Sequence, residues 1–173
     1  MLRWIAPLVF LASIARAGTD RVIHADTSFS PDEQVLLRRA ADELERQTFG
    51  VVRVRLVFDY DWSSLETVGR LARGPAMFRV ESDASIVGDI DAQKKAGVLG
   101  WCDRPHDWIY LVMDRFGSDD QLVHVAMHEI LHEIGVDHVN DPKALMWPAA
   151  APTSRPIVTA TDMSALCAVV TCR

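Results

Sequence analysis

The sequence HEILHEIGVDH, from His128 to His138, contains three histidines at a spacing that suits one metal ion. His128 and His132 are four residues apart, so on a helix their imidazoles share one face and can converge on a single Zn²⁺. Gly135 follows, where a residue without a Cβ can adopt positive φ, end the helix and turn the chain back. This turn would bring His138 to the same ion. The pattern predicts one zinc with three imidazole ligands and an open fourth position, which is typical of catalytic zinc.

Three further residues belong to the same hypothesis. Glu129 adjoins the first ligand, so we expect its carboxylate beside an attacking water and not on the metal, which is the position that a general base needs. Met146, in the sequence LMWP, is expected in a tight turn that forms an apolar floor under the imidazoles. His124 shares a helix face with His128, but we expect it to be a half-buried histidine and not a ligand, because the glycine turn already delivers a third histidine.

Periodicity and capping patterns predict an α+β fold. Ser30 to Glu33 is a capping box with proline at the first helical position, which predicts a helix up to about Gln47. Ser118 to Gln121 is a second box, and it opens the helix that carries the histidines. The other expected elements are strands at Arg21–Asp26, Val51–Tyr60, Ala76–Val80, Val98–Trp101 and Trp108–Asp114, a loop from Val87 to Gly97, and a last helix from near Thr159 or Thr161. This order predicts a twisted mixed β-sheet of about five strands with an antiparallel edge strand, two long helices and a C-terminal helix.

Residues 1–17 are typical of a secretory signal peptide. Arg3 precedes an apolar run from Ile5 to Ile14, and Ala15-Arg16-Ala17 then forms a small-residue cleavage pattern. A transmembrane anchor is the weaker alternative, because the run is far shorter than the roughly 20 residues that cross a bilayer. We therefore expect cleavage after Ala17, a single domain over residues 18–173, and a secreted protein, extracellular or periplasmic, that no membrane holds.

Composition limits the other functions. The chain has 173 residues, 49% of them hydrophobic, which suffices for one domain with a real core. Its net charge of −6 comes from interspersed acidic and basic residues, which argues against a nucleic-acid partner. The three cysteines, Cys102, Cys167 and Cys172, allow one disulfide in an exported protein, and all three pairings stay open. Cys167 falls on an apolar helical stripe and is at least as well interpreted as a core residue, and no cysteine is expected to be catalytic.

The motif as a whole resembles the signature of the metzincins, H-E-x-x-H-x-x-G-x-x-H followed by a methionine turn. The matching residues are His128, Glu129, His132, Gly135, His138 and Met146. Among metzincins, the stretch from His128 to Pro148 is most similar to the matrixins, the matrix-metalloproteinase family, through its short gap and its DPKALMWP ending. The resemblance implies a zincin-like fold in which the three histidines bind one zinc ion, Glu129 is the base and peptide bonds are cut.

The sequence also differs from typical matrixins. Val139 and Trp147 stand where matrixins usually have serine and tyrosine. The segment from Glu81 to Gly97 contains no histidine, so a second, structural zinc has no ligands there. Three aspartates of this segment could hold calcium, although a solvated acidic loop explains them better: Asp83, Asp89 and Asp91. The chain before the first helix is too short for an inhibitory propeptide, and we interpret CDRPHD at Cys102, which loosely resembles the propeptide cysteine motif, as a coincidence.

We therefore expect a secreted, monomeric zinc endopeptidase that acts on peptide or protein substrates. An extended peptide would pair antiparallel with the edge strand at Val98, Leu99, Gly100 and Trp101. Two alternatives stay open. The first is a non-catalytic zinc-binding protein derived from a peptidase, although such a site would gain nothing from a base at Glu129. The second is a zinc amidase with a non-peptide substrate.

Overall fold

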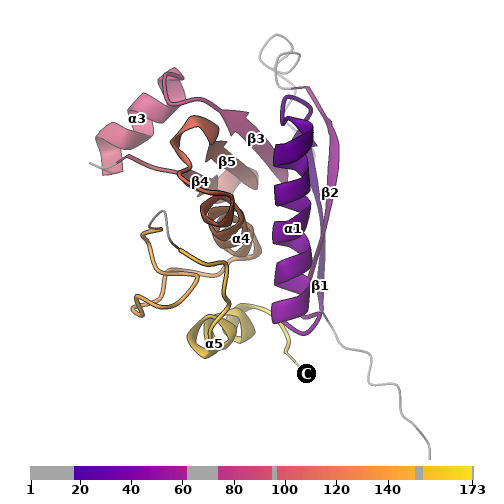
Figure 1. Ribbon diagram of the computed structural model, residues 1–173. Helices are drawn as coiled ribbons and strands as arrows, with labels where there is room; N and C mark the ends of the chain where they lie inside the picture. The colour runs from indigo at the N-terminus through magenta and orange to yellow at the C-terminus, as the bar shows by residue number, and fades with distance from the viewer. Residues whose placement is uncertain (1–17, 62–73, 95–96, 151–153, 173) are drawn as a thin grey trace, which may run out of the picture.

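The computed structural model describes residues 18–61, 74–94, 97–150 and 154–172. The predicted signal peptide, residues 1–17, lies outside these ranges and stays a prediction. The elements, shown in Figure 1, are β1 (Thr19–Asp26), α1 (Pro31–Gln47), β2 (Val52–Tyr60), β3 (Ala76–Val80), α3 (Ser85–Lys94), β4 (Gly100–Asp103), η1 (Arg104–His106), β5 (Trp108–Val112), η2 (Met113–Arg115), α4 (Asp119–Ile134) and α5 (Ala160–Val169). Within the described ranges, no helix is both long and apolar enough to cross a bilayer.

The described strands form one mixed sheet with the order β2-β1-β3-β5-β4. Every neighbouring pair is parallel except β4 and β5, which are antiparallel. The expected antiparallel edge strand is therefore present. It begins two residues later than the sequence suggested, at Gly100 and not at Val98.

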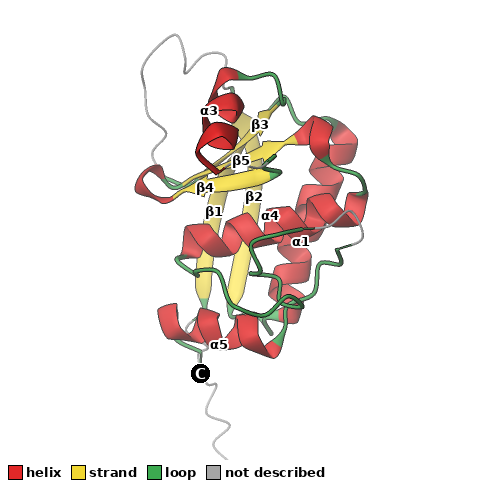
Figure 2. Cartoon of the chain, turned by 90° about the vertical axis from the view of Figure 1, so that its left-hand side faces the viewer, coloured by secondary structure: helices red, strands yellow, loops and turns green. Residues whose placement is uncertain are grey.

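Helices cover both faces of this sheet. Met77, Ile109 and Leu111 face the larger core, which α1 and α4 close from one side. Their chain neighbours Phe78 and Tyr110 point the opposite way into an aromatic core that α3 covers. α1 lies along β1 and β2, whereas α4 lies by β4 and β5 (Figure 1). Figure 2 shows α5 at the end of the molecule opposite α3, so the edge strand and the last helix approach α4 from different directions.

The helix α3 corrects the prediction of a loop from Val87 to Gly97. Its buried residue is Val87, with Ile86 and Ile90 packed against the same aromatic core. Gly88 and the aspartates lower the intrinsic helix propensity of this segment, which is why its sequence resembles a loop. The helix is stabilised by packing against the sheet, and this contribution depends on residues far away in the sequence.

The cysteines pair in a way that the sequence left open. Cys167 and Cys172 form a disulfide, and Cys102 is the free cysteine. The interpretation of Cys167 as a core residue is wrong, because it is exposed and its neighbour Leu166 makes the buried contact of α5. α5 ends at Val169 and the chain becomes extended, which returns Cys172 to the last turn of the helix.

Candidate metal centre

The helix α4, which carries the first two histidines of the motif, is buried on almost all sides. Ser118 caps it by accepting the N–H of Gln121 at 3.2 Å. The other bond of the expected capping box goes to a neighbour, since Oε1 of Gln121 accepts the N–H of Gly117 at 2.8 Å. Every residue from Gln121 to Leu131 is buried. The helix is thus fixed between the sheet and the segment that follows it, and so is the spacing of its histidines.

Gly135 ends α4 with φ of 107°. A Cβ at this position would meet nothing within 4 Å, so glycine is needed for its conformation and not for space. The N–H groups of Gly135 and Val136 bond back to the carbonyls of His132 and Leu131, at 3.0 and 2.9 Å, as in a helix C-cap. The chain then reverses and carries His138 back towards the helix.

The three histidines converge on one point. Nε2 of His138 lies 3.2 Å from Nε2 of His128 and 3.0 Å from Nε2 of His132. Nitrogen ligands at 2.0–2.1 Å from a tetrahedral zinc are about 3.3 Å apart, so the arrangement fits one ion. Within the described part of the chain, this is the one group of three or more His, Cys, Asp or Glu residues whose ligand atoms are close enough to hold a metal. Asp83, Asp89 and Asp91 do not belong to this group.

Backbone carbonyls orient two of the rings. Nδ1 of His128 donates to the carbonyl of Leu145 at 2.8 Å, and Nδ1 of His132 donates to the carbonyl of Val136 at 2.7 Å. A proton held on Nδ1 leaves the lone pair on Nε2, which is the atom that faces the point of convergence. The chain itself therefore selects the tautomer that a metal would bind.

Burial also keeps these imidazoles neutral. Desolvation is the main cause that lowers the pKa of His128 to about 3, and the neighbouring His132 and His138 lower it further. The pKa of His132 is lowered to about 4, again mainly by burial. Both rings are thus uncharged at neutral pH, and the neutral imidazole is the form that binds a metal.

Glu129 lies beside the histidines in a cavity of about 280 Å³. Its side chain is buried, and it lines this cavity together with His132 and His138. The rest of the lining comes from the edge of the sheet and from the turn after α4: Gly100, Trp101, Cys102, Arg104 and Asp137. The predicted base, two predicted ligands and the predicted substrate strand therefore share one cavity.

Comparison with known proteins agrees with this geometry. A family model of the matrixins, Peptidase_M10, matches residues 12–168. The chain belongs to the matrixin family. Its structure is similar to archaemetzincin from Methanopyrus kandleri, with a TM-score of 0.56 and 12% sequence identity over 87% of this chain and 94% of that one. None of the curated proteins compared with the sequence matches it significantly. The similarity confirms the expected zincin-like α+β fold, and a family that depends on zinc agrees with the expected cofactor.

The methionine turn of this matrixin is held by a residue that the sequence interpretation missed. Met146 is fully buried, and the carboxylate of Asp162 accepts its N–H at 2.8 Å and that of Leu145 at 2.9 Å. Asp162 is itself fully buried and also accepts the N–H of Thr159, its partner in the capping box of α5. The spacing of Thr159 and Asp162 could have indicated the cap, but nothing local indicates the bonds to the turn. A contact of Met146 with the imidazoles stays a prediction.

His124 lies outside the metal-binding group. Its Nδ1 donates to the carbonyl of Arg155 at 2.9 Å, and it is more deeply buried than expected. Burial lowers its pKa. The ring therefore links α4 to the segment before α5, and the structure gives it a packing role.

Proposed function

We propose that this matrixin is a secreted zinc endopeptidase in which Glu129 is the general base. The observation that carries the proposal is the shared cavity, where Glu129 lies between convergent imidazoles and the open edge of the sheet. A non-catalytic zinc-binding protein would have no use for a buried carboxylate at this position. The family match supports a peptidase in preference to an amidase with a non-peptide substrate.

The β4–β5 ladder indicates which backbone groups can bind a peptide. The N–H of Val112 donates to the carbonyl of Leu99 at 2.8 Å, and Gly100 stands opposite Leu111. In an antiparallel ladder this register makes Gly100 and Cys102 the non-hydrogen-bonded positions, whose backbone groups point away from β5. An extended peptide would therefore add to the edge of the sheet at Gly100 and Cys102.

This register narrows the substrate strand that the sequence suggested at Val98, Leu99, Gly100 and Trp101. The N–H of Val98 already donates to Asp91 at 2.9 Å, and its carbonyl accepts from Arg115 at 2.9 Å. These bonds tie the start of the strand to α3 and η2 and leave neither backbone group of Val98 for a peptide. Of the four residues, Gly100 fits the proposed pairing best.

Glycine at position 100 also lets the strand approach the base. A Cβ on Gly100 would lie 3.0 Å from the carbonyl oxygen of Tyr110 and from Cγ1 of Val125, and 3.2 Å from Cγ of Glu129. A side chain there would push the strand and the helix apart. A peptide bound to β4 would therefore lie within reach of the Glu129 carboxylate.

The residues then have separate roles. His128, His132 and His138 would hold the ion through Nε2. When bound, zinc supplies Lewis-acid chemistry that makes water more acidic and polarises a carbonyl oxygen. Glu129 takes the proton of the attacking water and returns it to the leaving amine nitrogen.

Two observations support secretion to an extracellular or periplasmic compartment. The sequence of residues 1–17 has the charge, apolar run and cleavage pattern of a signal peptide. Cys167 and Cys172 form a disulfide, and disulfides persist mainly in oxidising compartments.

The test is the Glu129→Gln variant. The amide keeps the shape of the side chain but cannot take a proton from water, so cleavage of a peptide substrate should fall by about 10²–10⁴-fold. Zinc content and melting temperature should stay near those of the wild type. Cleavage at the wild-type rate by a folded, zinc-loaded variant would disprove the base assignment.

Denatured protein, offered with and without a chelator, separates the alternatives. A peptidase cuts it only without the chelator. A zinc-loaded wild type that cuts neither denatured protein nor a peptide library would favour the binding protein. Chelator-sensitive hydrolysis of small amides alone would favour the amidase.

A further inference from the structure

The third histidine of the metal centre lies in a segment without regular secondary structure. His138 follows the turn at Gly135, so its position depends on what holds that turn. We propose that Arg104 is a positioning residue of the metal centre, which holds the turn after α4 so that His132 and His138 converge. This inference rests on the zinc site of the proposed function.

The guanidinium of Arg104 spans the turn. Its Nε donates to the carbonyl of His132 at 3.1 Å, on the helical side of Gly135. Its Nη2 donates to the carbonyl of Val136 at 2.6 Å, and its Nη1 donates to Oδ1 of Asp137 at 2.8 Å, both beyond the glycine. One side chain thus ties together the end of the helix and the two residues that precede His138.

Arg104 is also linked to the imidazole of a metal ligand through one shared carbonyl group. The carbonyl of Val136 accepts from both Nη2 of Arg104 and Nδ1 of His132. The same Nη2 lies 3.2 Å from this Nδ1, so the guanidinium lies against the imidazole. A shift of Val136 would turn the His132 ring, and Arg104 opposes that shift.

The arginine itself is anchored in the sheet. It directly follows β4, whose last residue, Asp103, pairs with Trp108 of β5. The N–H of Asp107 bonds back to the carbonyl of Arg104 at 3.2 Å, and Pro105 restricts φ in between. The turn is therefore held from a rigid edge of the sheet.

A second anchor lies on the other side of His138. The N–H of Val139 donates to the carbonyl of Met146 at 3.1 Å. The third histidine is thus placed between a bond to the methionine turn and the contacts of Arg104. Removing either anchor leaves the other to hold the segment alone.

Arginine suits this position better than lysine does. The last carbonyls of a helix lack partners within the helix and carry partial negative charge, which a cation stabilises. The planar guanidinium directs three separate N–H groups at three acceptors, whereas an ammonium has one nitrogen to place. The geometry therefore predicts that charge alone cannot replace Arg104.

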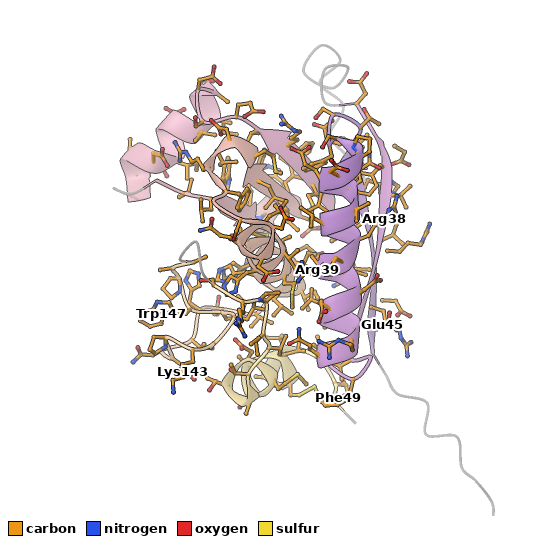
Figure 3. The ribbon with its side chains drawn as sticks, viewed as in Figure 1. Arg38, Arg39, Glu45, Phe49, Lys143 and Trp147 are labelled. Atoms are coloured by element: carbon orange, nitrogen blue, oxygen red, sulfur yellow. A yellow bond between two sulfur atoms is a disulfide. The ribbon has the colours of Figure 1, made fainter. Side chains whose placement is uncertain are left out.

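The experiment compares zinc affinity in three variants of the full chain: Arg104→Ala, Arg104→Lys and Arg39→Ala. Arg39, labelled on α1 in Figure 3, is a matched control because it also bridges two elements, through a 2.7 Å bond to Asp120. Its side chain is 43% exposed, against 40% for that of Arg104. The measurements are the zinc dissociation constant, by competition with a chelator, and the absorption spectrum of the Co²⁺-substituted protein. Circular dichroism checks that each variant is folded.

We expect Arg104→Ala to weaken zinc binding by about 10–100-fold, the usual effect of removing a group that orients a ligand, and to change the Co²⁺ spectrum. The loss of zinc affinity in Arg104→Lys should be nearly as large as that in Arg104→Ala. Arg39→Ala should bind zinc as the wild type does. Wild-type affinity and spectrum in a folded Arg104→Ala would overturn the proposal. If that variant does not fold, the same two measurements on Arg104→Lys decide, and wild-type values there would overturn it.

The wild type distinguishes this proposal from the proposed function. Suppose that the zinc-loaded wild type cuts no peptide but that Arg104→Ala binds zinc more weakly than the wild type does. This result would support the positioning role of Arg104 and contradict the proposed peptidase activity. A wild type that binds no zinc would overturn both.

Discussion

At the residue scale, the metal centre depends on which nitrogen of each histidine carries the proton. The carbonyls of Leu145 and Val136 settle this for His128 and His132, because a carbonyl can only accept. The motif spacing predicts that the rings share a face, but these acceptors come from the chain beyond the helix. His138 has no helix to place it and relies on the turn at Gly135.

The ligands can be distinguished by comparing His138→Ala with His124→Ala. We expect His138→Ala to lose most zinc affinity, because one of three ligand nitrogens is removed. His124→Ala should keep zinc, since its ring bonds to the carbonyl of Arg155 and lies outside the group. Equilibrium dialysis followed by elemental analysis measures both. The reverse ranking would mean that the turn does not deliver the third ligand.

Acid should destabilise the metal-free protein. The pKa values of His128 and His132 are lowered from 6.5 to about 3 and about 4 in the folded state, so below pH 6.5 the unfolded chain binds more protons. Stability is therefore fully present above about pH 6.5 and falls as the pH decreases towards about 4. The melting temperature of chelator-treated protein over this range measures the effect. The melting temperature of His128→Gln should depend less steeply on pH than that of the wild type. An equally steep dependence would show that protonation of His128 does not cause the effect.

At the scale of elements, the short helix α5 fixes the methionine turn. Asp162 at its N-terminus accepts the N–H groups of Leu145 and Met146, and the carbonyl of Leu145 orients His128. The turn carries Trp147 and Lys143 on the side of the molecule opposite α1 (Figure 3). Although α5 carries no metal ligand, it therefore helps to fix the carbonyl that orients His128 on α4.

We predict that Asp162→Asn is strongly destabilising. The amide presents an N–H₂ group to donors that now face a carboxylate, and buried donors without acceptors cost at least about 2 kcal/mol in free energy of unfolding. Zinc binding should weaken as well, because Leu145 orients His128. Urea unfolding measures the first effect and chelator competition the second. Thr159→Ala removes the helix cap and one hydroxyl bond to Asp162 but leaves both bonds of Asp162 to the turn, so it should cost about 1 kcal/mol. Equal losses in the two variants would argue against the role of the turn.

At the scale of the whole molecule, the cavity forms where three parts of the fold meet. β4 supplies one wall, α4 supplies Glu129 and His132, and the segment after α4 supplies His138. β4 is at the edge of the sheet because no further described strand pairs with it, which leaves room for an extended peptide. The position of α4 by β4 and β5 therefore makes the sheet part of the site.

The disulfide should contribute little to this architecture. It links cysteines only five residues apart, and so short a loop stabilises the fold by about 2 kcal/mol. We expect the double variant Cys167→Ser, Cys172→Ser to lose no more than this in urea unfolding and to keep its zinc. Denatured, unreduced wild type should expose one thiol, that of Cys102, to a thiol reagent, and three after reduction. Three thiols before reduction would contradict the pairing.

The sequence alone determined the parts of this protein that depend on local geometry. His128 and His132 share a helix face because of the helical repeat, and Gly135 permits positive φ because it lacks a Cβ. The capping box at Ser30 likewise located the start of α1. Each of these follows from residues within one or two turns of each other.

Only the tertiary structure decided the rest. The helix α3, the register of β4, the bonds of Asp162 to the methionine turn and the contacts of Arg104 all join residues that are distant in the sequence. Their energies come from burial and from hydrogen bonds that exist only once the chain is folded, so no local pattern records them. The ligand residues could therefore be read from their spacing, whereas the groups that hold them in place could not.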